Sequence, residues 1–202
     1  MNKDVPEFDA YFAHLRQIST LGRLYKRYVT SPILYTHARR FGQRVMEVGC
    51  GTGSGVLGAF PQRVSGLEIN PAAVDYSLKR GLDVQLIPEE GTFPVVDCAF
   101  DACILDNVLE HIEHPRRTLD ECHRITSPTG GLVIAVPGLK GFATDSDHKK
   151  FYEAKHLAAL DARWNLVSLF STPLGFSSAY LSRSMRQYCL VAIYQKLQPG
   201  LM

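Results

Sequence analysis

The stretch VMEVGCGTGSG, residues 45–55, combines a short apolar run, one carboxylate and four glycines. The run Val45–Val48 is typical of a buried strand, and the glycines after it allow a sharp turn with the backbone close to a ligand. A helix following the turn would direct N–H groups and the positive end of its dipole toward that ligand. We therefore expect a strand–loop–helix junction that binds a ligand through its backbone.

The spacing of these glycines differs from two common nucleotide-binding loops. Counted from Gly49, a dinucleotide-binding G-x-G-x-x-G loop needs a glycine where this chain has Ser54. A Walker loop needs a Gly-Lys-Ser or Gly-Lys-Thr, and neither follows. The glycines thus explain how a ligand could approach, but they do not identify it.

Around this stretch, apolar segments of strand length alternate with amphipathic helical segments. This alternation indicates linked βαβ units and a mainly parallel sheet. We predict that the last strand returns antiparallel as a hairpin-like edge, since no long helix separates it from the strand before. The predicted strands are 45–48, 63–68, 83–87, 102–106, 131–136, 165–170 and 187–195, and the predicted helices lie near 55–60, 71–80, 115–125 and 152–163.

The first part of the chain has a helical pattern. Apolar residues recur at three- and four-residue steps from Phe8 to about Phe41, and Gly22 and Pro32 are expected to divide this region. Residues 1–44 carry eight Lys or Arg against three acidic residues, although the whole chain has a net charge of only +2. Aromatic residues here could shield a ligand or simply pack: Tyr11, Phe12, Tyr25, Tyr28 and Tyr35.

Composition predicts one soluble, cytoplasmic domain. The chain has 202 residues, of which 46% are hydrophobic and 21% charged, as in ordinary globular proteins. No stretch approaches the roughly 20 apolar residues of a spanning helix. Its five cysteines lack a close-paired CxxC, which favours reduced thiols over a disulfide framework.

Several motifs in fixed order resemble those of class I S-adenosylmethionine-dependent methyltransferases. EVGCGTG (47–53) matches the family's acidic residue followed by G-x-G-x-G, and Glu68 ends the second predicted strand. Residues 88–115 resemble the family's acidic loop, its Phe-Asp pair and its Val-Leu-Glu-His segment. Residues 127–138 resemble the family's Pro-Gly-Gly turn, although Thr129 replaces the first glycine. The resemblance covers about residues 43–195 and is strongest to small-molecule enzymes of the ubiquinone and menaquinone type.

The resemblance implies an α/β fold and a methyl donor. The fold would be Rossmann-like: a seven-stranded, mainly parallel sheet with the last strand antiparallel and helices on both faces. A helical N-terminal extension or lid (residues 1–42) would precede the methyltransferase domain (43–202). The cofactor would be S-adenosyl-L-methionine, leaving S-adenosyl-L-homocysteine. Glu68 would bind the ribose hydroxyls, Glu47 the amino-acid end, and Glu89 or the backbone of Gly91 the adenine. The full set expected to bind the cofactor is Glu47, Gly49, Cys50, Gly51, Gly53, Glu68, Ile69, Glu89, Gly91, Asp106 and Asn107.

The acceptor side is less defined by sequence. His111 is placed near the methyl donor, with a packing role as its competitor, and the segment with His148 and Tyr152 resembles one that closes over the acceptor. Either His148 or Tyr152 could take a proton from an acceptor hydroxyl. The order of Glu110, His111, Glu113 and His114 is neither H-E-x-x-H nor H-x-x-E-H, so we expect no metal site there.

Three functions remain open from sequence. The leading hypothesis is direct SN2 methyl transfer to a small-molecule acceptor, with no nucleic-acid partner and no membrane insertion. Neither the Asn/Asp-Pro-Pro-Tyr loop nor the Pro-Cys nucleophile of base methyltransferases occurs after the fourth predicted strand, where ILDNVLEH (104–111) stands. The alternatives are a regulatory protein that binds the donor without turnover and, further off, an NAD(P)-dependent oxidoreductase.

Overall fold

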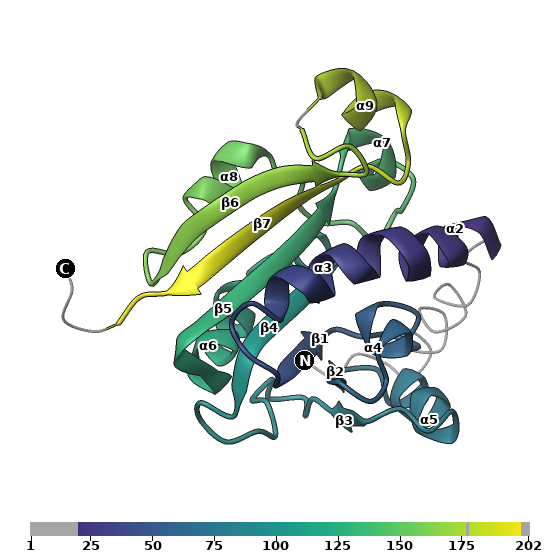
Figure 1. Ribbon diagram of the computed structural model, residues 1–202. Coiled ribbons are helices and arrows are strands. Elements are labelled where there is room, and N and C mark those ends of the chain that lie inside the picture. The colour runs from purple at the N-terminus through teal and green to yellow at the C-terminus, as the bar shows by residue number, and fades with distance from the viewer. Residues whose placement is uncertain (1–19, 177, 199–202) are drawn as a thin grey trace.

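The sheet has seven strands in the order β3-β2-β1-β4-β5-β7-β6, as Figure 1 shows for a computed structural model that describes residues 20–176 and 178–198. All neighbouring strands are parallel except where β7 pairs with β5 and β6. The mainly parallel, seven-stranded sheet is therefore confirmed. The strands are β1 Val45–Val48, β2 Val64–Glu68, β3 Val84–Leu86, β4 Phe100–Asp106, β5 Thr126–Pro137, β6 Trp164–Thr172 and β7 Cys189–Lys196.

Helices cover both faces of this sheet, as predicted (Figure 1). Alternate strand residues point to opposite faces: Cys103 and Leu105 of β4 join one core cluster, whereas Ile104 joins the other. The first cluster packs under α6 and α8, and the second under α3, α4 and α5. The helices are α2 Thr20–Tyr25, η1 Lys26–Thr30, α3 Ser31–Ala38, α4 Val56–Ala59, α5 Pro71–Lys79, η2 Leu109–His111, α6 Arg116–Ile125, α7 Leu139–Phe142, α8 Ala154–Ala158 and α9 Ala179–Ser184.

The N-terminal helical segment runs without a break in Figure 1, so Gly22 and Pro32 do not divide it. Gly22 lies inside α2, and Pro32 lies in the first turn of α3, where its missing N–H is tolerated. A π-helical turn, η1, joins the two helices. The part of the prediction that covers residues 8–19, with Tyr11 and Phe12, lies outside the described residues.

Two predictions about the last third of the fold were wrong in detail. The final strand, β7, is antiparallel but is not an edge: it lies between β5 and β6, and β6 forms the edge. The helix expected over 152–163 is only α8, because a turn around Asp161 ends it, with the N–H groups of Arg163 and Trp164 donating to Asp161.

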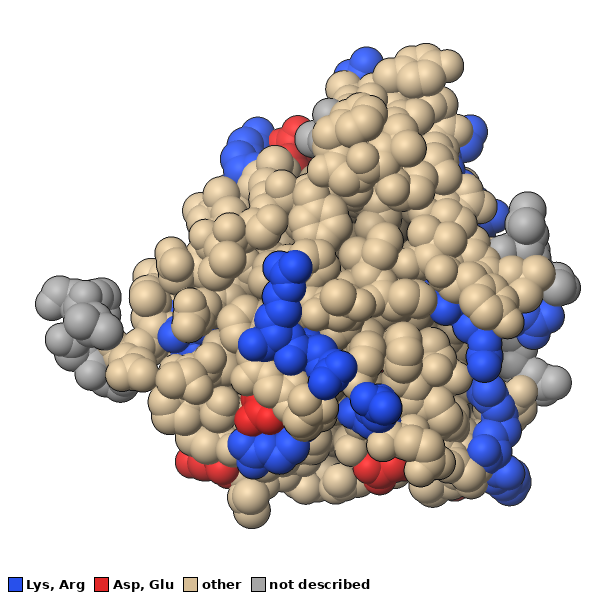
Figure 2. All heavy atoms as spheres, in the orientation of Figure 1, with Lys and Arg blue, Asp and Glu red and all other residues tan. Residues whose placement is uncertain are grey.

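Basic side chains are spread over the face of the molecule that carries the N-terminal helix, among only a few acidic ones (Figure 2). Several of the arginines of residues 20–44, such as Arg23, Arg27 and Arg39, are exposed. Among the described residues, no helix combines the length and apolar character needed to cross a membrane.

Candidate functional site

The candidate site lies where the order of strands reverses. The chain leaves β1 and runs outward to β2 and β3 on one side, then returns to β4 on the other side of β1. Open α/β sheets bind ligands at the carboxyl ends of strands beside such a reversal. Here Gly49, Glu68 and Asp106 stand at those ends of β1, β2 and β4.

The glycine loop differs from the expected junction, whose backbone N–H groups were to be free for a ligand. Gly49, Gly51 and Gly53 all have positive φ, as the turn requires. Their N–H groups are used internally, however: Gly49 donates to Leu67 O at 2.7 Å, Gly51 to Glu68 Oε2 at 2.7 Å, and Gly53 to Cys50 O at 3.0 Å. These three glycines therefore serve backbone conformation and close approach, and their own N–H groups are not directed at a ligand.

Glu47 occupies the start of the helix after the loop. Its carboxylate accepts hydrogen bonds from the N–H groups of Val56 (3.2 Å) and Leu57 (2.6 Å), so the first N–H groups of α4 do not face a ligand. Burial, with the nearby charge of Asp106, raises the pKa of Glu47 to about 7. Glu47 therefore caps the start of α4.

Glu68 closes the end of β2 and is held in one orientation by the backbone. Oε2 accepts from Gly51, and Oε1 accepts from the N–H groups of Ile69 and Asn70, both at 2.9 Å. Burial raises the pKa of Glu68, while these hydrogen bonds oppose the shift. A carboxylate has about four lone-pair sites, so this geometry leaves it able to accept a further hydrogen bond from a ligand hydroxyl.

Lys26, which the sequence analysis did not single out, reaches this edge from the N-terminal helix. Its Nζ lies 3.1 Å from Asp106 Oδ2. Burial lowers the pKa of Lys26, but the charges of Asp106 and Glu47 outweigh it and leave the pKa raised. Asn107, with a positive φ of 55°, follows and donates to Asp106 Oδ1 at 2.8 Å. The only sequence feature that pointed to Lys26 was the excess of basic residues in 1–44, and this excess does not distinguish Lys26 from the other basic residues.

Comparison with known proteins assigns the family. A family model described as "Methyltransferase domain" matches residues 46–134. A demethylmenaquinone methyltransferase of Renibacterium salmoninarum is 34% identical over 155 residues, which are 73% of this chain and 60% of that protein. The chain belongs to the class I S-adenosylmethionine-dependent methyltransferases. It spans less than two thirds of the length of this relative.

Solved methyltransferases share the fold at lower sequence identity. A SAM-dependent methyltransferase of Thermotoga maritima superposes with a TM-score of 0.70 at 16% identity, over 94% of this chain and 99% of the other. A geranyl diphosphate C-methyltransferase of Streptomyces coelicolor A3(2), solved with Mg²⁺, geranyl diphosphate and S-adenosyl-L-homocysteine, gives 0.64 at 13% identity, over 83% and 80%. The sheet order of this chain is therefore that of a methyltransferase fold.

The edge of the sheet fits the methyl donor of this family. This edge carries three buried carboxylates, those of Glu47, Glu68 and Asp106. Among the described residues, Lys26 pairs with one of them, Asp106. The edge therefore suits a ligand with a sulfonium and an ammonium group. A Cβ on Gly55 would lie 2.4 Å from Glu47 Oε1, so the backbone and carboxylate are as close as a glycine permits. S-adenosyl-L-methionine is the cofactor of the family, and these residues suit its charge.

The remaining residues expected to bind the cofactor differ in accessibility. Ile69 is 43% exposed, and Glu89 is also exposed. Gly91 is half-buried, with a positive φ and its N–H donating to Pro88 O at 2.8 Å. Cys50 is buried, its N–H donates to Leu67 O, and a Cβ on Gly66 would meet its sulfur at 2.7 Å. Its side chain is therefore part of the core.

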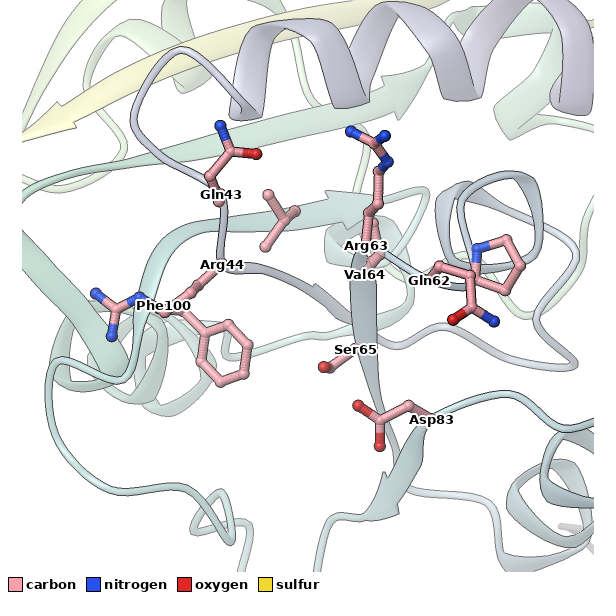
Figure 3. A pocket seen from close by; sticks show the side chains of 10 residues that line it. Gln43, Arg44, Gln62, Arg63, Val64, Ser65, Asp83 and Phe100 are labelled. Carbon is pink, nitrogen blue, oxygen red and sulfur yellow. The ribbon is translucent and has the colours of Figure 1, made fainter.

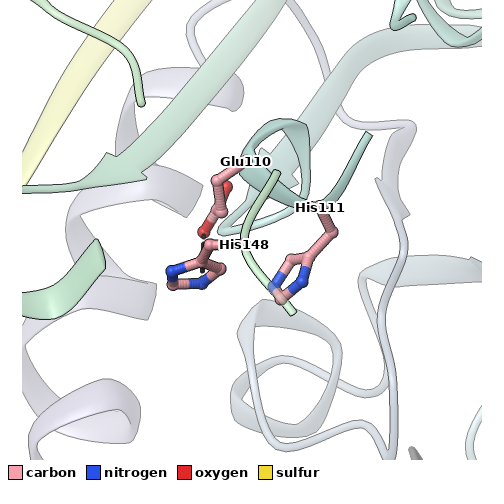
Figure 4. Close-up of side chains that lie close together, drawn as sticks. All are labelled: Glu110, His111 and His148. Atoms are coloured by element: carbon pink, nitrogen blue, oxygen red, sulfur yellow. Dashed lines mark ion pairs between the residues drawn. The ribbon is translucent and has the colours of Figure 1, made fainter. Parts of the chain in front are cut away.

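The two histidines expected on the acceptor side come together. The rings of His111 and His148 lie 4.6 Å apart edge to face, and Glu110 lies beside them (Figure 4). Burial, followed by His148, lowers the pKa of His111, although Asp147 opposes the shift. Tyr152 is 2% exposed, and burial raises its pKa to about 12. Its phenol therefore stays protonated at neutral pH, unlike a general base.

One cavity lies away from this edge. It has a volume of about 350 Å³ and is lined by residues at the amino ends of strands, including Val45, Val64 and Phe100 (Figure 3). The edge with Glu68 and Asp106 is at the opposite ends of the same strands. This cavity therefore belongs to a different surface.

Proposed function

We propose that this chain is a methyltransferase that moves a methyl group from S-adenosyl-L-methionine to a small-molecule acceptor. The observation that carries the proposal is Glu68: a buried carboxylate fixed by three backbone N–H groups, one of them from the glycine loop, at the switch point of the sheet. A carboxylate in this position suits the two ribose hydroxyls of a nucleoside. The demethylmenaquinone methyltransferase to which the chain is similar supports a small acceptor.

The donor would lie along the edge formed by β1, β2 and β4. Glu68 would hold its ribose, and the segment with Glu89 and Gly91 would lie beside its adenine. Glu47 and Asp106 would balance its ammonium group, while Lys26 would attract its carboxylate. When bound, the donor supplies an electrophilic sulfonium methyl for direct displacement by an acceptor lone pair.

The protein's contribution is orientation and exclusion of water. Holding an acceptor in line can supply up to about 7–11 kcal/mol of the barrier reduction, whereas a general base adds about 10²–10⁴-fold. We infer that the N-terminal helix covers the donor, since it brings Lys26 to Asp106. In this proposal residues 1–42 form a lid and residues 43–202 form the methyltransferase domain. His148 or His111 would accept any proton that the acceptor releases.

Calorimetric titration with S-adenosyl-L-homocysteine tests donor binding. We expect the folded wild-type chain to bind it more tightly than NADH, and Glu68→Gln to bind it at least about ten-fold more weakly. The control variant Asp83→Asn changes an exposed carboxylate just before β3, at the opposite ends of the strands, and should bind like wild type. Methyl transfer from labelled donor to a metabolite extract then tests turnover. Tighter binding of NADH contradicts the proposal in favour of an oxidoreductase, and binding without any labelled product favours a regulatory protein.

A further inference from the structure

Glu110, His111 and His148 form a cluster that donor binding does not use. Glu110 and His111 lie in η2, directly after β4, and His148 comes from the loop between α7 and α8. One ligand atom from each lies within 4.8 Å of the others. Figure 4 shows the carboxylate and both rings converging from these two segments. We propose that the cluster binds a divalent first-row transition-metal ion.

The carboxylate of Glu110 is the first argument for a cation. The residue is 1% exposed, and neither of its oxygens accepts a hydrogen bond from any residue that the structure describes. The nitrogen facing it is His148 Nε2, which lies 3.9 Å from Glu110 Oε1 and also 3.9 Å from Asp145 Oδ2, beyond the 2.7–3.2 Å of a hydrogen bond. Burial raises the pKa of this carboxyl, which favours its neutral form when no cation is present. Buried charges in proteins are paired or coordinate metals, so an ionised Glu110 would need a cation between these atoms.

The orientation of the two histidines is the second argument. His148 Nδ1 lies 2.8 Å from the carbonyl oxygen of Phe142, which only accepts, so Nδ1 carries the proton and Nε2 carries the lone pair that faces Glu110. His111 Nδ1 lies 3.0 Å from Asp147 Oδ2, which fixes the same tautomer. Histidines that bind metals are held in this way, through the other ring nitrogen, by a carboxylate or a backbone carbonyl.

The spacing also fits one ion. Ligand atoms about 2.0–2.2 Å from a metal can stand up to about 4.2 Å apart, and the Glu110–His148 separation of 3.9 Å falls within that span. Small side-chain rotations would bring all three atoms into bonding distance. Two imidazoles and one carboxylate favour zinc, iron or related ions over calcium and magnesium, which prefer oxygen ligands.

Three protein ligands leave coordination positions open. With an ion bound, the two imidazoles act as ligands and not as proton acceptors, and the ion would instead lower the pKa of a bound acceptor oxygen, whose proton passes to solvent. The cluster follows the carboxyl end of β4, as Asp106 does, so an ion there would hold an oxygen of the acceptor beside the donor. This role, unlike metal binding itself, rests on the proposed function. It narrows the acceptor to molecules with a hydroxyl or carboxyl oxygen able to ligate a metal. The sequence-based expectation of no metal considered only residues 110–114, which do not include His148.

Titration of the EDTA-treated, full-length chain with Zn²⁺ tests the site, with Co²⁺ absorption as the readout of histidine ligation. We expect about one equivalent to bind, and Glu110→Gln and His148→Gln to weaken binding at least ten-fold. Asp147→Asn should weaken it about ten-fold or more by releasing His111. The control pair, Glu113→Gln and His114→Gln, changes exposed neighbours of the same types and should bind like wild type.

Two further readouts separate the possible failures. Glu110→Gln removes a buried carboxylate, so its metal-free melting temperature should equal or exceed that of wild type while the Zn²⁺-induced rise is lost. S-adenosyl-L-homocysteine is titrated into the same samples. No metal binding by a chain that binds this nucleoside, or equal metal affinity in Glu110→Gln and wild type, overturns the metal site alone. Metal binding by a chain that does not bind the nucleoside leaves the site standing and overturns the proposed function.

Discussion

At the scale of single residues, Glu47 links donor binding to pH. Burial, with the charge of Asp106, raises its pKa to about 7, so lowering the pH below 7 protonates it in the free protein. A ligand ammonium group favours the charged carboxylate, and binding at low pH must therefore release a proton. We expect the affinity for S-adenosyl-L-homocysteine to fall by up to about ten-fold per pH unit below about 7.

Calorimetry in buffers of different ionisation enthalpy measures that proton directly. Glu47→Gln keeps the size of the side chain and removes the titration, so its affinity should be weaker at pH 8 and nearly independent of pH between 6 and 8. An unchanged pH profile in this variant would show that Glu47 only caps α4, through Val56 and Leu57.

Sequence predicted those site residues that are tied to the ends of strands. Glu68 and Asp106 follow apolar runs, and the carboxyl ends of parallel strands meet at one edge of the sheet, so their approximate positions follow from the pattern. Lys26 lies on a segment whose approach to that edge depends on tertiary packing, so sequence did not single it out, and His148 was named only through the resemblance of its segment to one that closes over the acceptor. The internal use of the N–H groups of Gly49 and Gly51 depends on the exact turn, which glycine spacing does not specify.

At the scale of elements, the loop after β1 depends on how closely it approaches the loop after β4. A Cβ on Gly49 (φ 72°) would lie 2.7 Å from Val108 Cγ2, whereas one on Gly81 (φ 74°) would meet no atom within 4 Å. Both alanine substitutions carry the strain of positive φ, about 1–2 kcal/mol. We expect Gly49→Ala to lower the free energy of unfolding by more than Gly81→Ala and to weaken S-adenosyl-L-homocysteine binding, which Gly81→Ala should leave intact.

Urea unfolding and calorimetry of the two variants provide the comparison. Because the φ angles of the two glycines are nearly equal, the difference in stability loss between the variants measures the close approach of Gly49 to Val108. Equal losses of stability would mean that only the positive φ matters at Gly49.

Arg124 of α6 organises the segment between β3 and β4, which has no regular secondary structure. Its guanidinium donates to Val95 O at 2.7 Å and to Phe93 O at 3.0 Å, and it pairs with Glu121 and Asp97. Lysine cannot reproduce this planar set of donors. We expect Arg124→Lys to cost about 1–3 kcal/mol in urea unfolding, and Arg116→Lys, in an exposed pair one helix turn apart, at most about 1 kcal/mol.

The element that sequence placed least well is β7. Its apolar residues and antiparallel direction could be predicted, because a chain that returns without a long helix cannot easily make a parallel crossover. Its position could not. Leu190 and Ala192 pack on one face and Val191 and Ile193 on the other, and such burial on both faces distinguishes an interior strand from an edge strand. The loop 173–188 carries the chain back so that β7 enters between β5 and β6.

At the scale of the whole molecule, the insertion of β7 between β5 and β6 ties the last strand to the interior of the sheet. Lys196, the last residue of β7, donates from Nζ to the carbonyl oxygens of His123 and Thr126, both at 2.7 Å. These carbonyls lie at the end of α6 and the start of β5. Trp164, the single tryptophan, is 5% exposed and pairs in register with Lys196. Its fluorescence therefore reports on the same junction.

We expect unfolding in urea to be one cooperative transition, with Trp164 fluorescence and far-ultraviolet circular dichroism giving the same midpoint. Lys196→Met keeps the length of the side chain but leaves two carbonyls without their donor, so it should cost about 1–3 kcal/mol and lower both midpoints together. Lys155→Met, in an exposed pair with Glu153, should change neither by more than about 1 kcal/mol. A fluorescence transition that precedes the dichroism change would mean that β6 and β7 separate from a sheet that stays folded, because only an independent hairpin can expose Trp164 first.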